Sequence, residues 1–271
     1  MTARIASIQM TSTENVQQNL DMAGVLIQQA VEQGAGLIVL PEMFALMGMD
    51  QFDKVRLRET FHQGPIQDFL QEQAKQHRIW LVGGTIPIAI SNDKSRARAA
   101  CLVYNDKGEL VARYDKVHLF DVHLRKSKEE YFESKTMEPG DKVVVVPTPF
   151  GRIGLAVCYD VRFPELFRRM HEQQVEIIIL PTAFTYTTGM AHWDILVRAR
   201  AIENLAYVVA ACQTGVHPNG RKTYGHSMIV NPWGDVIAVL PEAIGVLVKD
   251  IDLDYLKELR QDFPVLTHRR L

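Results

Sequence analysis

Apolar and polar positions along the chain alternate in a way that predicts repeated strand and helix segments. Residues 5–10 have the pattern of a short strand. Residues 16–31 then place apolar side chains on one helical face, with Asn15 as a candidate N-cap and Gly34 as a candidate stop. The apolar run that starts at Leu37 is typical of a strand buried on both faces. This order predicts a sheet that is covered by helices.

The same alternation continues to the end of the chain. Residues 118–141 are the exception, because they are polar and have no clear period, and a segment of this length is often a lid or a binding loop. Without a linker or a break in composition, we expect one domain over residues 1–271. The further expected elements are a helix at 66–74, a strand at 79–85, a hairpin at 99–116, strands at 153–157 and 175–184, a helix within 191–207, a strand at 207–215, a hairpin at 225–240, a strand at 244–252 and a helix at 253–261.

Composition narrows the class of protein. The net charge is −2 and 47% of the residues are hydrophobic, so nothing favours a nucleic-acid partner or a disordered acidic tail. Cys101, Cys158 and Cys212 are far apart and lack the spacing of a zinc site, which disfavours both disulfides and a metal centre. No apolar run approaches the roughly 18 residues of a membrane helix, and the amino terminus has no signal-like segment. We expect a cytoplasmic protein with no membrane partner.

Cys158 is the first candidate for chemistry. It follows an apolar strand at 153–157 and precedes Pro164, which suits the first turn of a helix. A side chain at such a strand-to-helix bend projects from the carboxyl end of a sheet, and a nearby helix amino terminus is expected to lower its thiol pKa. The alternative is a small buried hydrophobic residue, since free cysteines are commonly buried.

Three charged residues have both a functional and an ordinary interpretation. Glu42 follows a buried strand, where open α/β sheets place working groups, but such a carboxylate can also cap the next helix. Lys116 ends a hairpin and Glu133 lies in the polar segment, and either could simply be solvated. The residues by themselves leave these alternatives open.

Three motifs resemble those of the nitrilase superfamily of carbon–nitrogen hydrolases. They are LPEMF, YDKVHLFD and VCYDVRFPE, in the order found in that superfamily, and the resemblance extends over nearly the full chain. It implies a four-layer α-β-β-α sandwich, a homodimer or higher homo-oligomer, and a catalytic triad of Glu42, Lys116 and Cys158. Glu133 matches a second glutamate of the superfamily.

Further segments are similar to the Nit branch of amidases, namely FGRIGLAVCYDVRFPEL, TGMAHWDILVRARAIE, YGHSMIVNPWG and FPVLTHRRL. Nitrile hydrolysis is disfavoured, because Tyr159 and Asp160 stand where typical nitrilases have Trp and Glu. The resemblance implies hydrolysis of deaminated glutathione to 2-oxoglutarate and cysteinylglycine, a metabolite-repair reaction through a thioester. The alternatives are an ω-amidase acting on α-ketoglutaramate or a related 2-oxo acid amide, a thiol-dependent redox or sensor protein, and a catalytically silent interaction scaffold.

Amide hydrolysis assigns roles to these residues. Cys158 attacks, Glu42 moves the proton, and Lys116 with the Tyr159 N–H stabilises the oxyanion, without any metal or organic cofactor. Arg162 is the first candidate for a substrate carboxylate, with a structural salt bridge as its alternative. Weaker substrate-binding candidates are Thr187 and His192, and the segment that begins at Phe184 is expected to line the leaving-group side.

Overall fold

The computed structural model describes residues 2–125 and 129–270, and these residues form two main β-sheets packed face to face. The first is a seven-stranded sheet in the order β17-β1-β2-β3-β5-β4, with β6 paired to β5. Its strands are β1 (Thr2–Gln9), β2 (Leu37–Val39), β3 (Trp80–Val82), β4 (Ile86–Ile90), β5 (Asp93–Tyr104), β6 (Leu110–Asp115) and β17 (Gly245–Asp252).

The second sheet has six strands in the order β16-β15-β12-β11-β10-β9. Two short two-stranded ribbons, β7-β8 and β13-β14, lie outside the main sheets. The bounds of these strands are β7 (Asp121–Leu124), β8 (Glu129–Phe132), β9 (Val145–Thr148), β10 (Gly151–Leu155), β11 (Ile177–Thr182), β12 (Tyr207–Cys212), β13 (Thr214–Val216), β14 (Lys222–Tyr224), β15 (Ser227–Val230) and β16 (Val236–Leu240).

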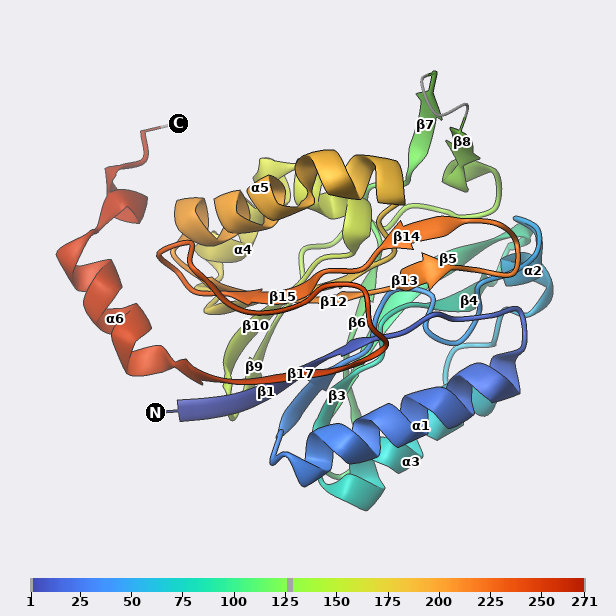
Figure 1. Ribbon diagram of the computed structural model, residues 1–271, viewed down its shortest axis with the longest axis horizontal. Coiled ribbons are helices and arrows are strands. Elements are labelled where there is room, and N and C mark those ends of the chain that lie inside the picture. The colour runs from blue at the N-terminus through green and yellow to red at the C-terminus, as the bar shows by residue number, and fades with distance from the viewer. Residues whose placement is uncertain (1, 126–128, 271) are drawn as a thin grey trace.

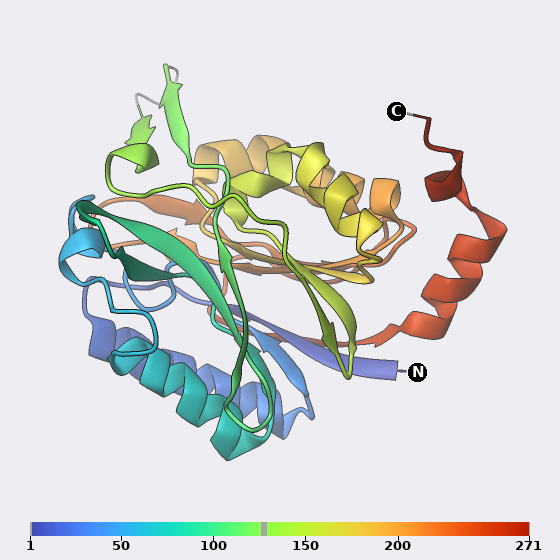
Figure 2. The same ribbon diagram turned by 180° about the vertical axis from the view of Figure 1, so that it is seen from behind.

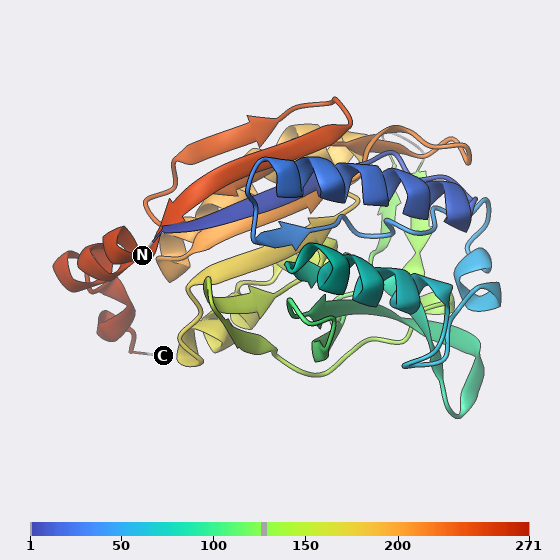
Figure 3. The same cartoon turned by 90° about the horizontal axis from the view of Figure 1, so that it is seen from below.

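Helices cover the outer face of each sheet, so the molecule has the four layers α-β-β-α (Figure 1). Helices α1 (Val16–Glu32) and α3 (Pro65–His77) lie side by side on the first sheet (Figure 3). Helices α4 (Pro164–Glu172) and α5 (Tyr186–Asn204) cover the second sheet. The expected sandwich is therefore confirmed.

The remaining helical segments lie at the edges. Helix α6 (Leu253–Asp262) and the 3₁₀ turn η3 (Val265–His268) extend from one side of the body, whereas the ribbon β7-β8 projects from the helix-covered top (Figure 2). The other short segments are α2 (Asp53–Arg56) and the 3₁₀ turns η1 (Glu133–Lys135) and η2 (Cys158–Arg162).

The residue pattern of β2 shows why the layers stack in this way. Leu37 and Val39 pack into the core between the two sheets, while Ile38 and Leu40 pack under α1 and α3. Because side chains alternate across a strand, an apolar run of this kind can bury both faces only when both are covered. All four side chains are fully buried, which agrees with the sequence-based interpretation.

Backbone hydrogen bonds connect the two sheets just after the carboxyl ends of β1 and β12. Met10 N–H donates to the Cys212 carbonyl at 3.2 Å, and Thr214 N–H donates to the Met10 carbonyl at 2.8 Å. These bonds form a parallel bridge between Met10 and Gln213, just beyond β1 and β12. The loops that follow the central strands of both sheets are thereby held against each other.

Most predicted elements are present, with some differences. Strands β4, β9 and β14 and helix α2 were not predicted, and α5 begins at Tyr186, ahead of the expected segment at 191–207. The polar segment 118–141 contains β7, β8 and η1. Residues 126–128 of that segment, Met1, and Leu271 at the end of the FPVLTHRRL motif lie outside the described residues.

Candidate active site

Four chain segments from both sheets bring Glu42, Lys116, Glu133 and Cys158 together. Glu42 follows β2 and Lys116 follows β6 in the first sheet, while Cys158 begins η2 after β10 of the second. Glu133 begins η1 after the ribbon β7-β8. The complete site therefore exists only when the sheets are packed, because Glu42 and Lys116 follow strands of the first sheet whereas Cys158 follows a strand of the second.

Lys116 is the centre of this cluster. Its Nζ donates to Glu42 Oε1 at 2.8 Å and to the Glu133 oxygens at 2.9 and 3.2 Å. The Lys116 side chain is only 2% exposed, so it is not one of the solvated lysines common at strand ends. Glu133 is also fixed by the Phe120 N–H, which donates to Oε2 at 2.7 Å.

The charges of the cluster stabilise one another. Burial lowers the pKa of Lys116, but Glu133 and Glu42 outweigh it and hold that pKa well above its usual 10.5. Burial raises the pKa of Glu133, but Lys116 and then Lys54 outweigh it and keep that pKa below 4.5. Lys116 is consequently cationic and Glu133 anionic at neutral pH.

The Cys158 thiol corrects one expectation. Burial, together with the negative charge of Glu42, raises its pKa well above 9.0, although Lys116 acts in the opposite direction. The thiol is thus protonated at rest, whereas a helix amino terminus was expected to lower its pKa. The reason is that Cys158 is only 7% exposed and is followed first by the short turn η2, and only then by α4, which begins at Pro164.

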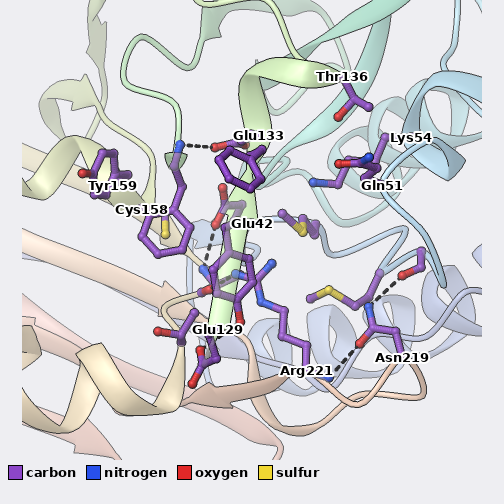
Figure 4. A pocket seen from close by; sticks show the side chains of 18 of the residues that line it. Glu42, Gln51, Lys54, Glu129, Glu133, Thr136, Cys158, Tyr159, Asn219 and Arg221 are labelled. Atoms are coloured by element: carbon purple, nitrogen blue, oxygen red, sulfur yellow. Dashed lines mark hydrogen bonds between the residues drawn. The ribbon is translucent and has the colours of Figure 1, made fainter. Parts of the chain in front are cut away.

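Cys158 also has an uncommon backbone conformation. Its φ is 46°, in the left-handed region that non-glycine residues seldom adopt. Such strain persists where the surrounding structure holds it, and it often marks a functional position. Here the bend turns the thiol toward the cavity described below (Figure 4).

Asp160 holds this bend against the segment that carries Lys116. Its Oδ2 accepts from Val157 N–H at 2.8 Å and from the Tyr114 hydroxyl at 2.7 Å. Its Oδ1 accepts from the His118 N–H at 3.0 Å and from His118 Nδ1 at 2.7 Å. The side chain is fully buried, so one carboxylate aligns the nucleophile turn with both flanks of Lys116.

The similar segments LPEMF and LPTAF meet at this site. The Ala183 N–H, which follows β11, donates to Glu42 Oε2 at 2.8 Å. Glu42 therefore accepts from Lys116 through one oxygen and from the backbone through the other. This contact between the segments that follow β2 and β11 orients Glu42.

A cavity of about 490 Å³ opens above these groups (Figure 4). Its volume lies within the range of about 300–1,000 Å³ that is common for small-molecule sites. Of the predicted site residues, the cavity is lined by Glu42, Lys116, Glu133, Cys158, Tyr159 and Phe184.

Arg162, Thr187 and His192 do not line this cavity. Arg162 lies against the rings of Tyr159 and Phe184, and its Nη2 is 3.3 Å from His192 Nδ1. Thr187 donates to Glu129 Oε1 at 2.9 Å. Their contact with a substrate stays a prediction, and among the described residues Arg162 does not form the alternative salt bridge to an acidic side chain.

Two cationic residues line the cavity that the sequence-based reasoning did not select. Lys54 comes from α2, and Arg221 comes from the turn between β13 and β14. Each lies in a polar segment that resembles ordinary surface sequence, so no local signal distinguished it. Their proximity depends on the packed fold.

Within residues 2–125 and 129–270, three further features bear on the kind of site. No group of three or more His, Cys, Asp or Glu side chains is placed to hold a metal ion. No helix in this part of the chain is both long and apolar enough to cross a membrane. The three cysteines are unpaired and buried.

The chain is similar to known proteins over nearly its whole length. The sequence profile described as carbon-nitrogen hydrolase matches residues 4–261. The deaminated glutathione amidase of Yersinia enterocolitica is 40% identical over 268 residues, which are 99% of this chain and 93% of that protein.

Solved structures are similar as well. The C. elegans NitFhit protein superposes with a TM-score of 0.93 at 38% identity, over 99% of this chain and 65% of that one. A mutant of the amidase from Nesterenkonia sp. AN1, solved with acrylamide added at its active site cysteine, has a TM-score of 0.77 at 27% identity, over 96% of this chain and 97% of that one.

Proposed function

The chain belongs to the carbon–nitrogen hydrolase family, and we propose from this premise that it hydrolyses deaminated glutathione to 2-oxoglutarate and cysteinylglycine through a thioester on Cys158. The observation that carries the proposal is the buried Lys116, which bonds Glu42 and Glu133 beside the Cys158 thiol at one cavity. The substrate is supported by the name of the relative that is 40% identical over nearly the whole chain.

The first half-reaction forms the thioester. Glu42 takes the thiol proton as Cys158 Sγ bonds to the amide carbon, which matches a thiol that is protonated at rest. Lys116 and the Tyr159 N–H stabilise the oxyanion, each contributing about 3 kcal/mol in comparable sites. Collapse of the tetrahedral intermediate breaks the C–N bond, and Glu42 gives its proton to the departing amine of cysteinylglycine.

The second half-reaction releases the acid. Glu42 takes a proton from water, the hydroxide oxygen bonds to the thioester carbon, and the C–S bond breaks as the proton returns to sulfur. Glu133 stays ionised and keeps Lys116 in place and charged throughout. The hydrogen bond from Ala183 N–H holds the Glu42 carboxylate in reach of both reactions.

Other parts of the proposal rest on the sequence. Arg162, Thr187 and His192 remain proposed substrate contacts, whereas Tyr159 and Phe184 already lie at the cavity. A homodimer or higher homo-oligomer and a cytoplasmic location are also proposed.

Product analysis tests the reaction. Purified protein with deaminated glutathione should release equal amounts of 2-oxoglutarate and cysteinylglycine, and Cys158→Ala should release neither while keeping a wild-type circular dichroism spectrum. Quenched turnover should leave an acyl adduct on Cys158, not on the buried Cys101 or Cys212. Activity of the Cys158→Ala variant would refute the mechanism. A clear kcat/KM preference for α-ketoglutaramate over deaminated glutathione would replace the proposed substrate with that of an ω-amidase.

A further inference from the structure

Two cations form the wall of the cavity away from the nucleophile. In Figure 4, Cys158 is labelled on the left, Lys54 on the upper right and Arg221 below, with Glu42 near the middle of the view. Glu133 and Arg221 have the largest charge effects on the pKa of Lys54, whereas Glu42 and Lys116 are the main charges that act on the pKa of Cys158. Lys54 and Arg221 therefore lie near each other at the cavity, and neither is among the main charges that act on the thiol.

Neither cation has an acidic partner within the described part of the chain. Lys54 makes no ion pair there, and burial lowers its pKa because the desolvated charge is only partly compensated by Glu133. Arg221 donates through Nη2 to the Ala183 carbonyl at 2.6 Å and lies over the Tyr131 ring. Its Nε is buried and has no hydrogen-bond partner. An arginine donor in that state is costly, and the cavity that Arg221 lines is where an anion can approach its guanidinium.

The carboxylates that line the same cavity are already engaged elsewhere. Glu42 and Glu133 both accept from Lys116. Glu129 accepts from the Thr187 and Tyr131 hydroxyls at 2.9 and 3.0 Å. Glu130 pairs with His123 at 2.6 Å. Asp50, which also lines the cavity, bonds Arg56. Lys54 and Arg221 are thus the cavity cations that no carboxylate of the described residues contacts directly.

The position of Glu42 indicates which part of the substrate reaches this wall. Glu42 must protonate the departing amine, so the amine leaves on the Glu42 side of the thiol. Arg221 is linked to this same group, because it bonds the Ala183 carbonyl while Ala183 N–H bonds Glu42. A substituent on the amine that extends past Glu42 meets Lys54 and Arg221.

We propose that Lys54 and Arg221 bind the carboxylate at the far end of the leaving group, so that the enzyme selects amides whose amine half is a peptide or amino acid with a free carboxyl terminus. This inference rests on the proposed function, in which that group is the glycine carboxylate of cysteinylglycine. It also gives a physical reason for preferring deaminated glutathione over α-ketoglutaramate, whose leaving group is ammonia. Binding energy at this distance from the reacting carbon can be used in the transition state.

The test compares deaminated glutathione with its carboxyl-terminal amide, which differs only in that charge. For the wild type, kcat/KM should be about 10- to 100-fold higher for the acid, as expected for hydrogen bonds to a charged group. In Lys54→Met and in Arg221→Met this ratio should fall toward one, while Lys54→Arg should retain it. Lys142→Met, which removes an exposed lysine outside the cavity, is the matched control and should keep the wild-type ratio.

A ratio within one preparation does not depend on the fraction of active protein, so partial misfolding of a variant cannot imitate the result. An unchanged ratio in both Met variants would overturn the inference and leave the proposed function intact. An equal loss of kcat/KM for acid and amide is such an unchanged ratio, and it would mean that the cations serve a part of the substrate other than this carboxylate. Absence of wild-type turnover of deaminated glutathione would instead refute the proposed function.

Discussion

Replacing Asp160 by asparagine should destabilise the protein far more than such a small change usually does. Each carboxylate oxygen accepts two hydrogen bonds, from Val157 and Tyr114 on one side and from the two His118 donors on the other. Asparagine keeps the shape but offers only one acceptor oxygen. In either amide orientation, one backbone N–H, that of Val157 or that of His118, loses its acceptor and faces the NH₂ group, whereas the Tyr114 hydroxyl or His118 Nδ1 on that side can accept from it.

The magnitude follows from that one backbone donor. An unsatisfied buried donor costs about 1–3 kcal/mol, so Asp160→Asn should lower the free energy of unfolding by about 1–3 kcal/mol. That is a substantial part of the roughly 5–15 kcal/mol that stabilises a typical domain. Activity should fall as well, because the same bonds hold the strained backbone of Cys158, with its φ of 46°, against the Lys116 segment.

Urea denaturation followed by circular dichroism measures this change. The midpoint should move to lower urea at an unchanged slope, which separates lost stability from a changed denatured state. Asp141→Asn is the control, since Asp141 is exposed and its substitution should change the free energy by less than about 0.5 kcal/mol. If Asp160→Asn lost less than about 1 kcal/mol and kept wild-type kcat, the assigned role of this network would be wrong.

Two further predictions concern the charged cluster. Lys116→Met should lower kcat by about 10²- to 10³-fold in steady-state assays with a smaller effect on KM, because the oxyanion forms only along the reaction path; near-normal kcat would remove Lys116 from catalysis. Since the pKa of Glu133 lies below its usual 4.5, Glu133 contributes stability that is complete above pH 4.5 and is lost as the pH falls below it. In Glu133→Gln, the urea midpoint should therefore change less with pH below pH 4.5 than it does in the wild type. The same dependence on pH in both proteins would contradict the ion pair.

The first helix shows how far local sequence determines structure. Asn15 accepts from Gln18 N–H at the start of α1, and Gly34, just after its end, has a φ of 82°. Both features were predicted, because capping and the left-handed stop depend on residues within one turn of the helix end. The apolar face of residues 16–31 then packs under the first sheet.

Elements that depend on distant neighbours were harder to predict. Strand β4 contains Pro87 and pairs at the edge of its sheet, which is where a strand can accommodate proline. The start of α5 includes Gly189, where an added Cβ would lie 2.3 Å from the Cβ of Tyr224. That close approach needs glycine at a position where helix propensity argues against it. Pro87 in a strand and Gly189 in a helix are understandable only once the neighbouring strand and Tyr224 are in place.

The residues of the site also fall into those that local sequence predicted and those that depend on distant neighbours. Glu42, Lys116, Glu133 and Cys158 stand in motifs that resemble a known family, and the structure brings all four together. The expected low thiol pKa was wrong, because burial and the neighbouring carboxylate depend on the other sheet.

Lys54 and Arg221 lay outside every motif. Both residues stand out only in the folded structure, where each lines the cavity and has no acidic partner among the described residues. The linear sequence does not contain that property.

The bridge between Met10 and Gln213 has a consequence for how such a protein can change over time. It is made by backbone groups, through Met10 N–H and its carbonyl, so no ordinary side-chain substitution removes it. The contact between the ends of β1 and β12, one in each sheet, is therefore set by the main chain. Residues of the cavity wall can be exchanged, and new amides accommodated, while this contact between the sheets stays in place. Changes in substrate specificity can therefore accumulate while this backbone connection between the sheets is retained.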